Sequence, residues 1–258
     1  LEPYYGGSHK AFLDGWIRKS RHAWTVLGLP ARIWKWRMRH ASYTFAEQIQ
    51  ERIAAGERWD VLFCSDMLNL PEFLGLAPPE VRDLTSILYF HENQLTYPDP
   101  RASERDCHYG MVNLTSCLTA TAVWFNSHFN RDDFLGAPPG FFEWMPDHPP
   151  KDALNRIREK SSVYPQGIEP FPERENRPPG PLRILWAARW EHDKDPDAFF
   201  EAIRRLQKRG LNFRLSVIGQ SFRKRPTVFD KAREEFADRI DHWGYQRSRD
   251  AYRRILRE

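Results

Sequence analysis

Residues 182–200 read LRILWAARWEHDKDPDAFF, a short apolar run followed by a charged turn and then by a helix-like segment. The run Leu182–Ala188 has the length and composition of a buried strand, and Asp195–Arg209 has the apolar spacing of an amphipathic helix. A second apolar run, Phe213–Ile218, follows that helix after a short turn. Strand, helix and strand in this order predict two parallel strands joined by a helical crossover, which is the repeating unit of an α/β fold.

The same alternation extends in both directions along the chain. It predicts parallel sheets with helices on both faces. Leu1 is followed almost at once by Tyr5-Gly6, so we expect no opening strand in the first unit. The other predicted strands are Trp24–Leu29, Trp59–Ser65, Ser86–His91, Val123–Ser127 and Ile240–Trp243, and the other predicted helices are Lys10–Lys19, Tyr43–Ala55, Glu104–Thr119, Ser127–Leu135, Val228–Ala237 and Ser248–Leu256.

A proline-rich segment divides the chain. Residues 169–181 contain five Pro in 13 positions, a composition typical of a domain boundary. We therefore predict an amino-terminal Rossmann-like domain over residues 1–170, a linker over 171–181 and a carboxyl-terminal domain over 182–258. Three predicted strands are few for a parallel domain, so we expect the second domain to be partial and the chain to be a fragment.

Composition excludes several classes of protein. The 258 residues include 39 Lys and Arg against 35 Asp and Glu, with 41% hydrophobic and 14% aromatic residues, which excludes a disordered chain. No apolar run approaches the roughly 20 residues of a membrane span, and no leader sequence opens the chain. Three cysteines are too few for a disulfide framework. We therefore expect a cytoplasmic protein that contacts no membrane.

A basic stretch lies near the start of the chain. Residues 18–40 contain seven Lys and Arg and no Asp or Glu. Within it Trp34, Lys35, Trp36, Arg37 and Arg39 alternate cations with indoles, a combination that can neutralise phosphates and stack on unpaired bases. The alternative is a solvated amphipathic helix whose Trp side chains lie in the core.

Parallel sheets bind ligands at the carboxyl ends of their strands, so the residues after each strand are candidate site residues. Gly6-Gly7-Ser8-His9 precedes a predicted helix, where backbone amides can hold phosphate, although a plain tight turn has the same composition. His91-Glu92-Asn93-Gln94 follows a predicted strand and favours a polar ligand over a solvated turn. Cys107-His108 and Cys117 show no ligand spacing with His91, so we predict no metal site.

Charged and glycine-containing turns follow the strands of the second domain. Arg189 and Lys194 lie five residues apart around one turn and could clamp a diphosphate from two sides. Gly219-Gln220 and Gly244-Tyr245 follow the next two strands, where a glycine lets the chain turn beside a ligand. The ordinary alternative for the two cations is pairing with the acidic residues of the same turn, Glu191, Asp193 or Asp195.

With these turns the chain resembles the retaining glycosyltransferases of family 4. The resemblance implies the GT-B fold, in which two Rossmann-like domains face a cleft that holds a nucleotide sugar. Arg189 and Lys194 match the pair that holds the donor diphosphate, and His91 matches the family's strand-end histidine. The other matches are the glycine loop at Gly6, Gly7 and Ser8, the hinge at Tyr164–Ile168, and the turns near the donor nucleotide at Gly219, Gln220, Gly244 and Tyr245.

A closer resemblance, to the tRNA-queuosine mannosyltransferase family, covers nearly the whole chain. It rests on an ordered set of motifs: Tyr4–Lys10, Leu29–Ala31 with Trp34–Arg37, Tyr89–Leu95, Pro146–His148 and Arg189–Pro196. It implies mannose transfer from GDP-mannose to queuosine at the wobble position of a tRNA, with no cofactor or metal. The acceptor-binding residues it implies are His9, Glu92, Asn93, Gln94, Trp34, Lys35, Trp36, Arg37 and Arg39.

The implied mechanism is a front-face retaining transfer. Arg189 and Lys194 stabilise the departing GDP, and His91 orients a hydroxyl beside the oxocarbenium-like centre. The family's acidic motif, two Glu separated by seven residues, has no match, because Glu234 and Glu235 precede the last predicted strand. Two alternatives are a family-4 enzyme that modifies a lipid or small molecule, and a non-catalytic module that binds nucleotide and tRNA.

Overall fold

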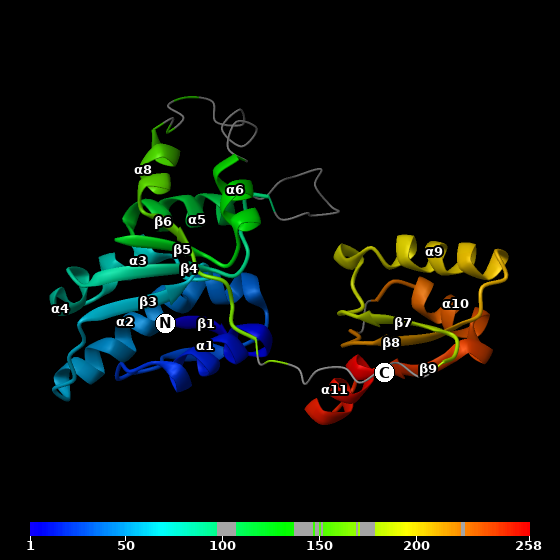
Figure 1. The fold of residues 1–258 in the computed structure, drawn as a ribbon. Helices are drawn as coiled ribbons and strands as arrows, with labels where there is room; N and C mark the ends of the chain where they lie inside the picture. Colours follow the sequence, from blue (N-terminus) through cyan, green and yellow to red (C-terminus); the bar gives the residue numbers. More distant parts are fainter. Residues whose placement is uncertain are drawn as a thin grey trace. The chain divides into compact units, whose positions relative to one another are not determined.

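The computed structural model describes residues 1–96, 107–136, 147, 150, 152–168, 170, 179–222 and 225–258. Most of the predicted linker, residues 171–178, and the ends of the motif Pro146–His148 lie outside the described residues. The described part of the chain folds as two compact units, one up to residue 168 and one from residue 170 onward. Figure 1 shows the elements of both units, and each unit is described by itself.

The first unit is built on parallel strands. Its strands are β1 (Glu2–Tyr5), β2 (Gly28–Pro30), β3 (Val61–Ser65), β4 (Thr85–Phe90), β5 (Ala122–Phe125) and β6 (Ser161–Val163). β1 pairs with β2, and β3, β4, β5 and β6 pair in that order. The Leu1 amino group donates to Phe63 O at 2.6 Å, and Ser65 N donates to Leu1 O at 3.4 Å, which places β1 beside β3. The resulting order β2-β1-β3-β4-β5-β6 is doubly wound, with its switch point between β1 and β3.

Helices cover both faces of this strand array, as the alternation predicts. Leu62 and Cys64 of β3 belong to a core formed with α2 (Trp34–Ala54), α3 (Leu70–Leu76) and α5 (Cys107–Thr119). Phe63, between them, packs on the opposite face with side chains of α1 (Gly7–Lys19). Because successive side chains of a strand point to opposite faces, this split follows directly from the apolar run. The remaining helices are α4 (Pro79–Arg82), α6 (His128–Gly136) and α8 (Ala153–Glu159).

The second unit is a three-stranded parallel sheet with its own core. The strands β7 (Leu182–Ala187), β8 (Phe213–Ile218) and β9 (Ile240–Gly244) pair in sequence order. Trp186, Phe200 and Phe229 lie in the core between this sheet and the helices. None of the helices in the described part of the chain is long and apolar enough to cross a bilayer. The other elements are η1 (His192–Lys194), α9 (Pro196–Lys208), α10 (Val228–Glu235), η2 (Ala237–Arg239) and α11 (Arg249–Arg257).

Two predictions about the start of the chain are wrong. An opening strand exists, because Glu2–Tyr5 pairs in parallel with Gly28–Pro30 although Pro3 and its polar neighbours lack an apolar strand pattern. Of the predicted strand Trp24–Leu29, only the last two residues belong to β2. The helix predicted to begin at Tyr43 begins at Trp34. The basic stretch is therefore helical.

Three short elements carry no signal in the sequence. β6 has the polar composition Ser161-Ser162-Val163 and becomes a strand by pairing with β5. α3 and α4 are four to seven residues long, which is too short for a helical period to stand out. The other predicted elements occur within a few residues of their expected bounds, and residues 104–106 of the predicted helix Glu104–Thr119 lie outside the described residues.

Candidate functional site

The carboxyl ends of β1, β3 and β4 bring together a cluster around His91. The backbone N–H of His91 donates to Asp66 Oδ1 at 2.9 Å, and its carbonyl accepts from Asn126 Nδ2 at 2.6 Å. Its ring Nδ1 lies 2.6 Å from Gln166 Nε2. Residues after β3, β5 and β6 thus fix both the backbone and the ring of His91 at the switch point of the sheet, where open α/β sheets bind ligands.

Glu2 and His9 complete this cluster. His9 Nδ1 lies 3.3 Å from Glu2 Oε1, and the His9 and His91 ring centroids are 4.0 Å apart. Glu2 is buried and also accepts from Tyr4 N at 2.9 Å and from Ser65 Oγ at 3.1 Å. The sequence analysis included His9 and His91 and missed Glu2 and Asp66. A carboxylate inside a short opening strand was the available signal, but the strand itself was not predicted.

The environment assigns different charges to these groups. Burial lowers the pKa of His91 to about 3, with the positive charge of His9 as the next cause. Burial also opposes the charged form of His9, but the hydrogen bond and negative charge of Glu2 outweigh it and raise the pKa of His9. For Glu2, burial is opposed by the same contact with His9, and its pKa is lowered. The protein therefore favours the carboxylate of Glu2 and the protonated form of His9, beside a His91 ring that is neutral at pH 7.

Asp66 is the second buried carboxyl group of the cluster. Burial raises its pKa to about 8, against the opposing effects of the His9 charge and the His91 N–H. Its Oδ2 has no hydrogen-bond partner among the described residues. Asp66 is therefore held mainly as the neutral acid at pH 7, which avoids a second buried negative charge beside Glu2.

The cluster also has the composition of a metal site. Glu2, His9 and His91 each offer one ligand atom, and these atoms lie within 4.8 Å of one another. The prediction of no metal considered only cysteines and His108 with His91, so it did not consider this set. Glu2 and His9 also contact each other at 3.3 Å, and the absence of a metal stays a prediction.

The glycine loop lies at the same edge. Gly6 precedes α1, which has no side-chain cap and no acidic residue in its first turn. A Cβ on Gly6 would lie 2.4 Å from the Ala31 Cβ, and Gly7 has φ +53°. Both glycines are therefore required by the local backbone, as in the tight-turn interpretation. The same turn presents the first amides of α1, at Gly7 and Ser8, beside His9, so the role in anion binding remains a prediction.

Of the polar residues after β4, Asn93 has a structural role. It is buried, its Oδ1 accepts from the N–H groups of Leu95 and Thr96 at 3.1 and 3.0 Å, and its Nδ2 donates to Asn130 Oδ1 at 3.1 Å. These bonds occupy the side-chain donor and acceptor atoms that a ligand would contact. The prediction that Asn93 contacts the acceptor is therefore corrected. Glu92 is exposed and Gln94 half-buried, and the amide of Gln94 lies 3.4 Å from Glu92 Oε1.

The first turns of α2 form an aromatic and cationic surface, which consists of Trp34, Lys35, Trp36 and Arg39. The Trp34 and Trp36 side chains are 37% and 58% exposed, so the alternative that places them in the core is wrong. Lys35 Nζ lies 5.4 Å from the Trp34 ring centroid. Exposed indoles beside mobile cations are the arrangement that binds unpaired bases and phosphates.

Arg37 does not belong to that surface. Its side chain is buried, its Nε donates to Pro30 O at 2.9 Å, and Nη1 lies 2.7 Å from His40 Nε2. The prediction that Arg37 contacts the acceptor is therefore corrected, because this guanidinium holds the turn before α2. Tyr4 links the surface to the histidine cluster, since it packs with Met38 and its ring lies 5.8 Å from that of His9.

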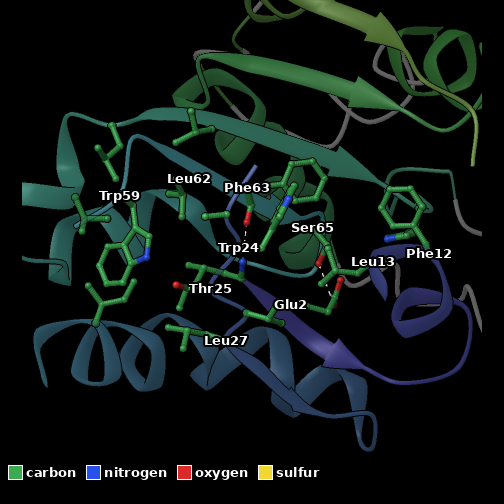
Figure 2. A pocket seen from close by; sticks show the side chains of 18 residues that line it. Glu2, Phe12, Leu13, Trp24, Thr25, Leu27, Trp59, Leu62, Phe63 and Ser65 are labelled. Carbon is green, nitrogen blue, oxygen red and sulfur yellow. Dashed lines mark hydrogen bonds between the residues drawn. The ribbon is translucent and has the colours of Figure 1, made fainter. Parts of the chain in front are cut away.

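An apolar pocket reaches the histidine cluster from the other end of β1. Figure 2 shows Trp24 and Trp59 among its apolar walls, and Glu2 and Ser65 joined by a hydrogen bond. His91 also lines the pocket. The buried Trp24 Nε1 has no partner among the described residues. Of the lining residues, only His91 was predicted to be a site residue.

In the second unit, a small pocket lies at the carboxyl ends of β7, β8 and β9. It brings together Arg189, Gly219, Gln220 and Tyr245, four of the predicted donor-binding residues. A Cβ on Gly219 would lie 1.9 Å from Ala188 O, so only glycine fits between these turns. Lys194 does not line the pocket. Gln246 and Tyr252, which the sequence analysis missed, also line it.

Arg189 and Lys194 have acidic partners in their own turn. Arg189 lies 2.9 Å from Glu191 and 3.7 Å from Asp193, and Lys194 lies 2.8 Å from Asp193. Burial of Asp193 is outweighed by its contacts with Lys194 and Arg189, which lower its pKa. Asp195 instead caps α9 by accepting from Ala198 N at 3.2 Å. The two cations therefore pair with acidic residues of the same turn, as the alternative predicts. A ligand phosphate must compete with Glu191 and Asp193 for these cations.

Comparisons with known proteins agree with these observations. A family profile described as tRNA-queuosine alpha-mannosyltransferase N-terminal matches residues 1–168. The tRNA-queuosine alpha-mannosyltransferase of Drosophila melanogaster is 34% identical over 268 residues, which cover 99% of this chain and 70% of that protein.

Solved structures resemble the chain in fold. An E. coli structure described as trehalose-6-phosphate bound with UDP-2-fluoro glucose has a TM-score of 0.53 at 13% identity, covering 99% of this chain and 61% of that chain. The OtsA apo structure has a TM-score of 0.51 at 13% identity, and the match covers 88% of this chain and 56% of that chain. These likenesses confirm the α/β GT-B class. From the family profile and the Drosophila relative together, the chain belongs to the tRNA-queuosine alpha-mannosyltransferase family.

Proposed function

We propose that the protein transfers mannose from GDP-mannose to queuosine at the wobble position of a tRNA. Family membership supports the reaction, and one observation in the structure supports the acceptor. The exposed Trp34 and Trp36 lie beside Lys35 and Arg39 on α2, which follows the carboxyl end of β2. An anticodon loop has unpaired bases and phosphates to match this surface.

The proposed reaction is a front-face retaining transfer. A queuosine hydroxyl oxygen bonds to the anomeric carbon as the bond from that carbon to the β-phosphate oxygen breaks, and the hydroxyl proton passes to the departing phosphate. Arg189 and Lys194 stabilise the negative charge of the leaving GDP. His91, neutral at pH 7, can orient the hydroxyl by a hydrogen bond, whereas its carbonyl already accepts from Asn126 at 2.6 Å.

His9 supports this assignment of roles. Glu2 favours its protonated form, and His9 lies in the first turn of α1, so the ring and the first amides of the helix can both face an anionic group of the substrates. Glu92 and Gln94 are the remaining candidates for acceptor contacts after β4. Gly219, Gln220 and Tyr245 are proposed to line the nucleotide site of the second unit.

The test is incubation of the protein with labelled GDP-mannose and tRNA, with or without queuosine, followed by mass spectrometry of the nucleosides. Addition of one hexose to queuosine alone supports the donor, the acceptor and the reaction together. Arg189→Ala is expected to abolish the product, and Arg205→Ala, a substitution on the exposed face of α9, is the matched control. Hexose transfer to a lipid or small molecule, with no product on tRNA, would contradict the proposal.

A further inference from the structure

The turn before α2 contains a strained residue. Ile33 is the N-cap of α2 with φ 51° and ψ 65°, in the left-handed region. A β-branched side chain is a rare occupant of that region, and such a conformation persists only where the surroundings impose it. Asp195 also has a positive φ, but its short polar side chain tolerates the conformation and caps α9.

Hydrogen bonds of Arg37 hold both ends of this turn. Its buried guanidinium donates to Pro30 O at 2.9 Å, on one side of the turn. On the other side, the backbone N–H groups of Trp36 and Arg37 donate to Ile33 O at 2.9 and 3.2 Å. Arg37 therefore binds the carbonyl groups at both ends of the turn, and this explains why a cation of the basic stretch is buried.

The result is an apolar tip among cations. Ile33 is 73% exposed and Trp36 is 58% exposed. Arg32, Lys35 and Arg39 are exposed around them. A single exposed Ile is common on protein surfaces, but here a strained backbone displays it beside an exposed indole. Strain of this kind is concentrated at sites that bind ligands.

We propose that the turn Arg32–Trp36 is a wedge for single-stranded RNA, in which Ile33 packs against the face of an unpaired base while the neighbouring cations contact the phosphates. Apolar side chains that enter a base stack act in this way in other nucleic-acid complexes. A continuous duplex offers no free base face at its centre, so the wedge distinguishes a loop from a helix. This inference rests on the proposed function. It assigns the recognition of unpaired bases, which that function requires, to the apolar side chain of Ile33.

The test compares Ile33→Gly and Ile33→Asn with the unchanged protein. Both substitutions suit the left-handed conformation and remove the apolar tip. Affinity is measured by fluorescence anisotropy with a labelled anticodon stem–loop and with a fully paired duplex of the same length. Thermal unfolding is recorded for each variant, and Leu76→Ala, which truncates an exposed apolar side chain on α3, is the control.

The wedge predicts opposite effects on stability and binding. Release of strain raises the melting temperature by about 2–4 °C, whereas the Kd for the stem–loop rises about five- to ten-fold. The Kd for the duplex stays the same, and Leu76→Ala changes neither affinity. Stem–loop binding by Ile33→Gly at the original affinity would overturn the wedge. Failure of the unchanged protein to bind either RNA would instead overturn the proposed function, and the wedge with it.

Discussion

The imidazole rings of His9 and His91 lie 4.0 Å apart between centroids, yet the pKa of His9 is raised whereas that of His91 is lowered to about 3. Two adjacent imidazolium ions would repel each other in a buried site, so the Glu2 carboxylate decides which ring is charged. Glu2 contacts His9 at 3.3 Å, and burial keeps His91 neutral. The relationship places a ring that favours its protonated form beside a neutral hydrogen-bonding ring at the switch point of the sheet.

Glu2→Gln is expected to lower the pKa of His9, because it removes both the negative charge and the strongest acceptor. The repulsion that His9 exerts on His91 then weakens, so the pKa of His91 rises from about 3. Nitrogen-15 NMR titration of the two rings measures both changes. Glu51→Gln, on the exposed face of α2, should leave them unchanged. An unprotonated His9 at pH 6 in the unchanged protein would contradict this account.

Asp66→Asn is expected to remove a pH dependence of stability. The folded protein raises the pKa of Asp66 from 3.8 to about 8, so in this range the folded state binds a proton that the unfolded state releases. Stability relative to the Asn variant therefore falls as pH rises from about 4 to 8, by at most about 1.4 kcal/mol per pH unit. Asn can still accept from the His91 N–H. Urea unfolding at several pH values measures the free energy of unfolding of both proteins. If the difference between them does not change with pH, the raised pKa of Asp66 is refuted.

Glu191→Gln is expected to strengthen GDP binding. Glu191 and Asp193 both pair with Arg189, so removal of the Glu191 charge leaves a ligand phosphate less competition for the guanidinium. Arg189→Ala should weaken binding at least ten-fold, which corresponds to about 1.4 kcal/mol. Isothermal titration calorimetry with GDP compares the two variants with Arg205→Ala as control. If Arg189→Ala binds GDP as the unchanged protein does, this turn does not hold the diphosphate.

Gly219→Ala is expected to disrupt the small pocket of the second unit. The added Cβ would meet Ala188 O at 1.9 Å, and the φ of +151° disfavours any L side chain. Crowding between backbone segments costs about 1–3 kcal/mol, and GDP affinity should fall as the two turns separate. Gly75→Ala, where a Cβ meets open space in α3, serves as the control for both measurements. Unchanged unfolding of the second unit would show that the turns adapt without cost.

Much of the fold could be predicted from the sequence, because long apolar runs and helical periods are local signals. β8 occurs at the predicted Phe213–Ile218, and α9 (Pro196–Lys208) lies within one residue of the predicted Asp195–Arg209 at each end. Elements that depend on partners could not be predicted in this way. The polar β6 is a strand because β5 offers it backbone groups. β1 likewise depends on the pairing of Glu2 with Gly28.

The candidate site likewise contains residues that the sequence could predict and residues that it could not. Residue type and position after a strand were sufficient to select His91 and Arg189 as candidates, and the family resemblance added His9. The sequence could not separate Arg37 from Arg39, because burial depends on the three-dimensional turn at Pro30. Nor could it identify Glu2 as the group that raises the pKa of His9, or Asp66 as the buried acid that accepts from the His91 N–H. Their effect comes from burial and from contacts between strand ends distant in sequence.

The measurement that tests the central claim most directly is mass spectrometry of the nucleosides after reaction with labelled GDP-mannose. Two tRNA samples are compared, one with queuosine and one with guanosine at the wobble position. The account predicts one added hexose on queuosine and none on guanosine, with the product lost in Arg189→Ala. Absence of labelled queuosine, with GDP and tRNA both bound, would contradict the assignment of the protein as the transferase.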